Sequence, residues 1–169
     1  MQLDAEKLIE LLAEKVDTLS ALAPNTAIVG IHTGGAWVAE RLVARLGPPL
    51  KASPCGTLAV TLHRDDFARR GLHPQKKSTD IPFTVDGRHI LLVDDVLQSG
   101  RTIRAALNEL FDFGRPASVK LAVLIDRGGR ELPMQADFVA LSMPLDAQQS
   151  LELTNENDVL RFEIREAKK

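Results

Sequence analysis

The sequence predicts an α/β fold with a mostly parallel, doubly wound sheet flanked by helices, a C-terminal β-hairpin and one long flexible loop. One sequence pattern occurs twice, at residues 27–47 and 90–116. It consists of an apolar strand, a glycine turn, an amphipathic helix and helix-terminating residues. Further apolar runs follow at residues 119–125 and 137–141. Strands that alternate with helices of about a dozen residues are typical of parallel sheets with helices on both faces.

The first half of the chain supplies a helix, a strand and a second helix. Residues 3–22 place leucines and valine at helical spacing between glutamates and lysines, which predicts an amphipathic helix. Residues 27–31 are a short apolar run, as expected of a buried strand. Residues 36–46 return to the helical period, and Gly47, followed by two prolines, predicts a left-handed cap and a helix stop. A weaker strand is expected at residues 57–62.

The second half adds a strand at residues 90–93, a helix at residues 101–113 and a tail of different character. Residues 151–153 and 159–164 flank a turn, and their alternation predicts a hairpin at an edge of the sheet or over the site. Residues 63–82 are long, polar and basic, and loops near 20 residues are uncommon in compact domains unless they are functional. A solvated surface excursion is the alternative for this loop.

The composition narrows the class of protein. With 169 residues, 44% hydrophobic and 26% charged, the chain suits one globular domain, and no apolar run approaches the roughly 20 residues that span a bilayer. Cys55 is the only cysteine, so no internal disulfide forms and a cytoplasmic location is expected. A net charge of −2 and an aromatic content of 4% argue against a strongly basic nucleic-acid binder and against a base-stacking platform.

Residues 93–102 contain the residue types that predict a ligand-binding site. They read Val-Asp-Asp-Val-Leu-Gln-Ser-Gly-Arg-Thr, an apolar strand that ends in two carboxylates, then a small-residue turn that opens a helix. Unpaired N–H groups at a helix N-terminus suit a phosphate, and Gly100 permits close approach of the backbone. Asp94 and Asp95 suit sugar hydroxyls or magnesium. The segment predicts a ribose-5-phosphate clamp, with an acidic strand end before a capped helix as the structural alternative.

A second glycine turn, Thr33-Gly34-Gly35, follows the strand at residues 27–31. By itself such a turn indicates little more than a tight bend. Two such turns in one parallel sheet, with a basic loop between them, are stronger evidence for a binding site. One turn would hold the phosphate and the other a diphosphate. The loop at residues 63–82 would close over the reacting centre and exclude water.

The ten-residue motif at residues 93–102 resembles the phosphoribosyl-diphosphate signature of the type I phosphoribosyltransferases. Further runs resemble one subfamily, the bifunctional pyrimidine-operon attenuation regulator and uracil phosphoribosyltransferase; they lie at residues 62–66, 81–83, 114–117, 121–127, 130–133 and 136–139. The resemblance implies conversion of uracil and phosphoribosyl diphosphate to UMP and diphosphate with Mg²⁺. It also implies UMP-responsive binding of pyrimidine-operon leader mRNA. A nucleotide-sensing regulator with little catalysis and a purine phosphoribosyltransferase are the alternatives.

The resemblance also implies the roles of single residues. Asp94 and Asp95 would hold the ribose hydroxyls, directly or through Mg²⁺, with Arg64 closing on the diphosphate as the third catalytic residue. The diphosphate turn would be Thr33, Gly34 and Gly35. The 5-phosphate would be surrounded by Gln98, Ser99, Gly100, Arg101 and Thr102.

The base would lie beneath Phe138, with the Val139 backbone reading its edge, although Phe138 could equally be a core aromatic. Purine relatives usually carry an aspartate where this chain has Gln98, whose amide cannot exchange a proton at neutral pH, and this favours a pyrimidine. The family's diphosphate turn usually has arginine at the position of Gly34, so Gly34→Arg is expected to tighten phosphoribosyl-diphosphate binding. Trp37 and the N-terminal helix are candidate interface material for a homo-oligomer, a dimer or higher.

Overall fold

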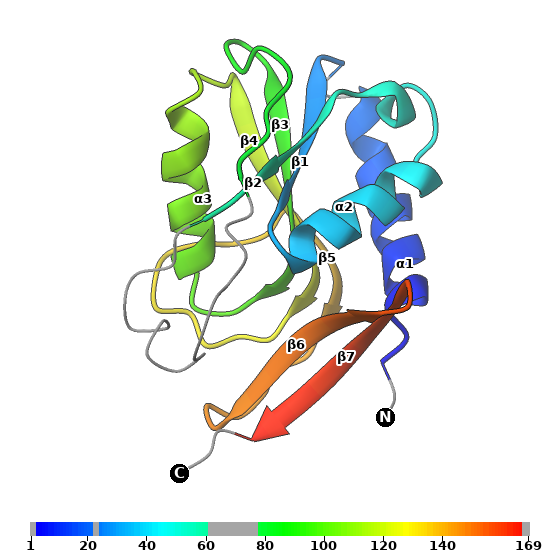
Figure 1. Cartoon of the computed structure of the whole chain (residues 1–169), viewed down its shortest axis with the longest axis vertical. Coiled ribbons are helices and arrows are strands. Elements are labelled where there is room, and N and C mark those ends of the chain that lie inside the picture. The colour runs from blue at the N-terminus through cyan, green and yellow to red at the C-terminus, as the bar shows by residue number, and fades with distance from the viewer. Residues whose placement is uncertain (1–2, 22–23, 61–77, 167–169) are drawn as a thin grey trace.

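The sheet has five strands in the order β2-β1-β3-β4-β5, and every neighbouring pair is parallel (Figure 1). The computed structural model of the chain describes residues 3–21, 24–60 and 78–166. The strands of this sheet are β1 (Thr26–Ile31), β2 (Cys55–Leu58), β3 (His89–Leu97), β4 (Ser118–Asp126) and β5 (Phe138–Ser142). The predicted mostly parallel, doubly wound sheet is confirmed.

Helices cover both faces of the sheet (Figure 1). The helices are α1 (Ala5–Asp17), α2 (Gly34–Arg45) and α3 (Arg101–Phe111), with short 3₁₀ turns η1 (Thr18–Ala21) and η2 (Leu50–Ala52). One core cluster joins α1 and α2 to one face of the sheet through residues such as Leu12, Leu42 and Leu91. A second cluster joins α3 to the other face through Ile103 and Leu110. The chain therefore buries its apolar residues in two layers, one on each side of the sheet.

The strand order reverses between β1 and β3. The chain leaves β1 through α2 and returns at β2 on one side, whereas β3 pairs with β1 on the other side. In open α/β sheets, ligands bind outside the carboxyl ends of the strands at such a switch point, because the flanking connections diverge there and leave a crevice. The fold thus directs attention to the residues that follow β1 and β3.

Several predicted boundaries are wrong by a few residues. The strand expected at residues 90–93 continues to Leu97, so both aspartates lie inside β3, because β4 runs alongside it as far as Asp126. The strand expected at residues 57–62 begins earlier, at Cys55. Gly47 does not have a positive φ and so forms no left-handed cap. Among the described residues, no helix has the length and hydropathy needed to cross a bilayer.

The C-terminal hairpin consists of β6 (Gln149–Glu156) and β7 (Val159–Glu166), as predicted. It crosses below the end of the sheet at which the strands finish (Figure 1). Its buried Leu153 and Leu160 belong to the core cluster of α1 and α2. The sequence left two positions open for this hairpin, at an edge of the sheet or over the site. The hairpin lies over the site.

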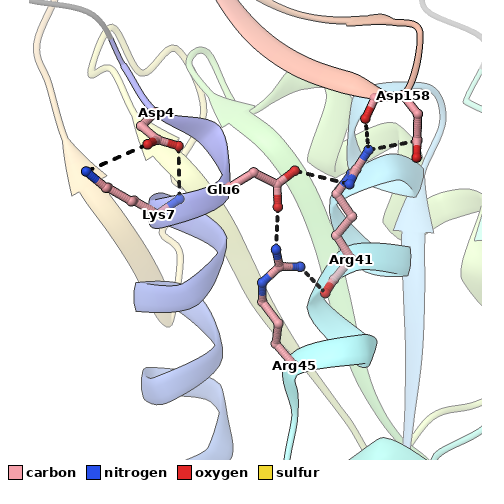
Figure 2. Close-up of polar contacts among 6 residues, drawn as sticks. All are labelled: Asp4, Glu6, Lys7, Arg41, Arg45 and Asp158. Carbon is pink, nitrogen blue, oxygen red and sulfur yellow. Dashed lines mark hydrogen bonds and ion pairs between the residues drawn. The ribbon is translucent and has the colours of Figure 1, made fainter.

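An ion-pair network ties the hairpin turn to α1 and α2 (Figure 2). Arg41 Nη1 lies 3.1 Å from Glu6 Oε1, and Arg41 Nη2 donates to the Asp158 carbonyl at 2.6 Å and to its carboxylate at 2.8 Å. Glu6 also pairs with Arg45, which donates to the Arg41 carbonyl at 3.0 Å. Arg41 is the centre of this network and has only 21% of its side chain exposed.

Arg41→Met is expected to lower the free energy of unfolding by about 1 kcal/mol, because it breaks a partly buried, multidentate network. The matched control is Lys7→Met, which removes only the exposed pair to Asp4, at 3.8 Å (Figure 2). The control should change the free energy by no more than about 0.5 kcal/mol. Urea denaturation of both variants measures the difference, and equal effects would show that the network adds no stability.

Candidate functional site

The site lies at the switch point, where Gly34 and Gly35, which open α2 directly after the turn that follows β1, meet the carboxylates of β3. The position that a Cβ atom would take at each glycine shows how closely the two segments approach. A Cβ at Gly34 would lie 2.1 Å from Asp95 Oδ2, and a Cβ at Gly35 would lie 2.4 Å from the Val93 carbonyl oxygen. Side chains cannot occupy those positions unless a neighbour moves, so the turn has glycines where it contacts the carboxylate pair. The two segments singled out in the sequence are brought together.

Asp94 is buried and Asp95 is half-buried, and backbone N–H groups anchor both carboxylates. Asp94 has 5% of its surface exposed. Its Oδ1 accepts the Asp95 N–H at 2.9 Å, and Asp95 Oδ1 accepts the Val96 N–H at 2.8 Å. Each of these bonds uses one carboxylate oxygen, and a side-chain hydrogen bond also joins the two carboxyls.

The surroundings of Asp94 and Asp95 disfavour ionisation of both carboxyls. Burial raises the pKa of Asp94 well above its ordinary value, and the neighbouring charge of Asp95 raises it further. Burial also raises the pKa of Asp95, against the lowering effect of its hydrogen bonds, and the charge of Glu152 on β6 adds to the rise. A ligand that supplies positive charge or hydroxyl donors would relieve this repulsion. The hairpin thus contributes to the electrostatics of the site.

Asp94→Asn is expected to increase the free energy of unfolding at pH 7, and to do so more than at pH 4. A carboxyl with a raised pKa in the folded state binds more protons when folded, so its contribution to stability falls as pH rises above its ordinary value of 3.8. The amide removes that penalty and keeps the acceptor for the Asp95 N–H. Denaturation at both pH values measures the difference between variant and wild type. A difference that shrinks toward pH 7 would contradict the raised pKa.

The turn after β3 has the backbone shape expected of an anion-binding loop. Gly100 is the N-cap of α3 and has φ +90°, the left-handed region that favours glycine. Ser99 Oγ accepts the Arg101 N–H at 3.2 Å. The Arg101 side chain turns to Glu131, with Nε 2.6 Å from its carboxylate. Thr102, in the first turn of α3, is half-buried.

A loop that the sequence marked only through the family resemblance supports this turn. We call residues 127–134, which follow β4, the support loop. The N–H groups of Glu131 and Leu132 both donate to the Ser99 carbonyl at 3.0 Å. A Cβ at Gly100 would lie 2.9 Å from Met134 Cγ. Only its tertiary position reveals the role of this loop, because its sequence has no periodic or phosphate-binding pattern.

The support loop begins at a polar strand end. Asp126 Oδ2 pairs with Arg130, and Asp126 Oδ1 accepts the Gly128 N–H at 3.0 Å. Partial burial raises the pKa of Asp126, but the hydrogen bonds from Arg130 and Gly128 and the charge of Arg130 outweigh it and leave the pKa below its ordinary value. Arg127 is buried, with 3% of its surface exposed, and donates to the Asp146 carbonyl at 3.1 Å. The end of β4 is therefore joined to both the support loop and the segment before β6.

The structure places Phe138 and Val139, the predicted base site, beside α1 and away from the carboxylate pair. Phe138 is level with Ala122 at the start of β5, away from the carboxyl end of the strand. It packs against the core cluster of α1 and α2, so it is the core aromatic that the sequence left as an alternative. The Val139 carbonyl accepts Lys15 Nζ of α1 at 2.6 Å. Burial by α1 accounts for both positions.

The close approach at Gly34 argues against tighter binding by Gly34→Arg, because any side chain there meets the Asp95 carboxylate. Arg64 and most of the loop at residues 63–82 lie outside the described residues. Of the remaining predicted residues, Gln98 is exposed, and a Cβ at Gly129 would lie 3.6 Å from its Cγ. Thr33 is the N-cap of α2.

The residues fit magnesium only together with a substrate. Among the described residues, no group of three or more His, Cys, Asp or Glu side chains could hold a metal by itself. Mg²⁺ in phosphate-transferring sites is bound through one or two carboxylates and through the substrate's phosphates, and it keeps several waters. Asp94 and Asp95 match that donor set, with one oxygen each left free of the backbone bonds.

Comparison with known proteins agrees with this geometry. The family model for the phosphoribosyl transferase domain matches residues 2–152. The chain belongs to the phosphoribosyltransferase family. Within that family it is similar to proteins named bifunctional protein PyrR. That of Nitrosococcus oceani is 55% identical over 82% of this chain and 77% of its own length. That of Ralstonia nicotianae is 50% identical over 93% and 89%.

Solved phosphoribosyltransferase structures share the fold at low identity. A hypoxanthine-guanine phosphoribosyltransferase from Bacillus anthracis aligns with a TM-score of 0.66 and 16% identity, over 85% of this chain and 84% of the other. A hypoxanthine phosphoribosyl transferase from Trypanosoma cruzi gives 0.64 and 21%, over 88% and 80%. At these identities the likeness concerns the fold alone, whereas the PyrR relatives, at 50–57% identity, place the chain in the PyrR branch of the phosphoribosyltransferases.

Proposed function

We propose that this phosphoribosyltransferase transfers the phosphoribosyl group to uracil, giving UMP and diphosphate. The observation that carries the proposal is the Asp94–Asp95 pair, in which Asp94 is buried, packed against Gly34 and Gly35 at the switch point. Carboxylates suit the ribose hydroxyls, and the two glycine turns on either side suit the two phosphate ends of phosphoribosyl diphosphate. The pyrimidine preference rests on Gln98 and on the resemblance to the PyrR branch.

The chain's own residues would act by positioning and charge. As the bond between ribose C1 and the diphosphate oxygen breaks, positive charge develops on the sugar ring, close to Asp94 and Asp95. Fixed carboxylates stabilise such charge without reorganising. The Thr33-Gly34-Gly35 turn would hold the diphosphate, and the backbone of residues 98–102 would hold the 5-phosphate, so that C1 faces the uracil nitrogen. Mg²⁺, held through Asp94 and Asp95 with the substrate, would supply charge neutralisation for the diphosphate.

A spectrophotometric assay with uracil, phosphoribosyl diphosphate and MgCl₂ tests this function. We expect turnover with uracil that exceeds turnover with hypoxanthine or guanine by at least tenfold. Preference for a purine would establish the alternative purine phosphoribosyltransferase. A folded protein that binds UMP but does not turn over uracil at any magnesium concentration would establish the nucleotide-sensing regulator.

A second function is proposed because the relatives are named bifunctional. It is UMP-responsive binding of pyrimidine-operon leader mRNA by a cytoplasmic homo-oligomer. A gel shift of leader RNA with and without UMP tests it, with sedimentation in the same buffer for the oligomeric state. UMP should tighten the shift. Binding that ignores both UMP and RNA sequence would reject attenuation.

A further inference from the structure

Each of the three guanidinium nitrogens of Arg130 makes a contact within the protein. Its Nε donates to the Met134 carbonyl at 2.7 Å, and its Nη1 donates to the Gln98 carbonyl at 2.8 Å. Its Nη2 pairs with Asp126 Oδ2 at 2.5 Å. Arg130 thereby joins three segments, the end of β4, the far end of the support loop and the turn after β3, while 26% of its side chain stays exposed.

The hydrogen bond from Arg130 to the Gln98 carbonyl fixes the orientation of a whole peptide unit. A peptide unit is planar, and in the trans form its N–H points opposite to its C=O. Holding the Gln98 carbonyl therefore sets the direction of the Ser99 N–H. The support loop treats the next peptide in the same way, because Glu131 and Leu132 donate to the Ser99 carbonyl and so set the direction of the Gly100 N–H. Two consecutive N–H groups are thus turned away from the support loop.

We propose that Arg130 is a positioning residue for phosphate binding, which orients the amides of the turn at residues 98–102 from behind. The inference rests on the proposed function, since it takes this turn as the holder of the 5-phosphate. Amides fixed in advance bind an anion without the cost of ordering the loop. Arginine suits the task because its planar fork presents several donors in one fixed geometry, which the single ammonium of lysine does not reproduce.

The experiment measures binding of ribose 5-phosphate by calorimetry and the kinetic constants for both substrates. For Arg130→Gln we expect Kd for ribose 5-phosphate to rise by about tenfold, which corresponds to about 1.4 kcal/mol. KM for phosphoribosyl diphosphate should rise similarly, while KM for uracil changes by less than about threefold. A general loss of structure would instead raise both constants and lower the Tm.

The matched control is Arg104→Gln, an exposed arginine of α3 in the turn of helix after the loop. It should leave the Kd for ribose 5-phosphate unchanged. Arg130→Lys keeps the charge beside Asp126, and should still weaken binding several-fold; it replaces Arg130→Gln if that variant does not fold. Wild-type affinity in a folded Arg130→Gln or Arg130→Lys protein would overturn the proposal.

The two proposals fail differently. If the wild-type protein binds ribose 5-phosphate but shows no turnover with uracil, the proposed reaction falls and the role of Arg130 is still decided by the variants. If the wild-type protein does not bind ribose 5-phosphate at millimolar concentration, the turn is no phosphate site, and the role of Arg130 is overturned with it.

Discussion

Asp95→Asn is expected to lower uracil phosphoribosyltransferase turnover by about 10²–10³-fold while the chain stays folded. The amide has the same shape and can still accept the Val96 N–H that anchors Asp95 Oδ1. It removes the negative charge from the oxygen that contacts the Gly34 turn, where the ribose and its magnesium would lie. Because the variant removes a carboxyl whose pKa is raised in the folded protein, the free energy of unfolding should hold or increase.

The measurement is kcat with saturating uracil and phosphoribosyl diphosphate, with the Tm as a check of the fold. The control is Asp112→Asn, an exposed carboxylate at the C-cap of α3, which should keep wild-type kcat. Turnover of Asp95→Asn within a few-fold of wild type would remove Asp95 from the reacting centre.

Gly34→Ala is expected to lower kcat/KM for phosphoribosyl diphosphate by about 10²-fold, because displacements near 1 Å in a reacting site have effects of that size. The added Cβ would lie 2.1 Å from Asp95 Oδ2 and 2.5 Å from its Cγ. The carboxylate has to leave the orientation that the Val96 N–H gives it, or the turn has to move away. Gly34→Arg should behave at least as badly, although the sequence had suggested that an arginine there would tighten binding.

Steady-state kinetics with phosphoribosyl diphosphate as the varied substrate measure this loss. Gly47→Ala is the matched control, since a Cβ there meets nothing closer than 3.7 Å and the residue has no positive φ. It should keep the kinetics of the wild type. Wild-type kcat/KM in Gly34→Ala would mean that Asp95 adjusts freely, and a gain from Gly34→Arg would restore the expectation drawn from the sequence.

Local pattern was enough for most of the fold. The apolar runs, the helical period and the stops predicted the parallel sheet, the helices and the hairpin, with boundaries wrong by a few residues. Strand ends were less predictable, since the length of β3 depends on how far β4 runs beside it. The motif at residues 93–102 and the Thr33-Gly34-Gly35 turn were found for a similar reason: each is a continuous segment whose residue types already suit phosphate and sugar.

The errors fall where the decisive neighbour is distant in the chain. Phe138 became a core aromatic because α1 packs over β5, more than a hundred residues away in sequence. Arginine at Gly34 looks favourable from the sequence, whereas the Asp95 carboxylate lies where its side chain would begin. Arg130 lies in a run that carried the family resemblance, and Glu152 lies in the predicted hairpin, but neither run indicated what these residues contact at the site.

The sequence by itself determined the ligand-binding segments of this phosphoribosyltransferase, because backbone amides, glycines and paired carboxylates are local features. Tertiary structure alone decided how close those segments come and which arginine contacts the phosphate turn. It also decided which carboxyls lie near enough to raise one another's pKa. Contact distances and burial depend on where the sheet places each strand end, and the two turns, some 60 residues apart, meet only because β1 and β3 are neighbours at the switch point.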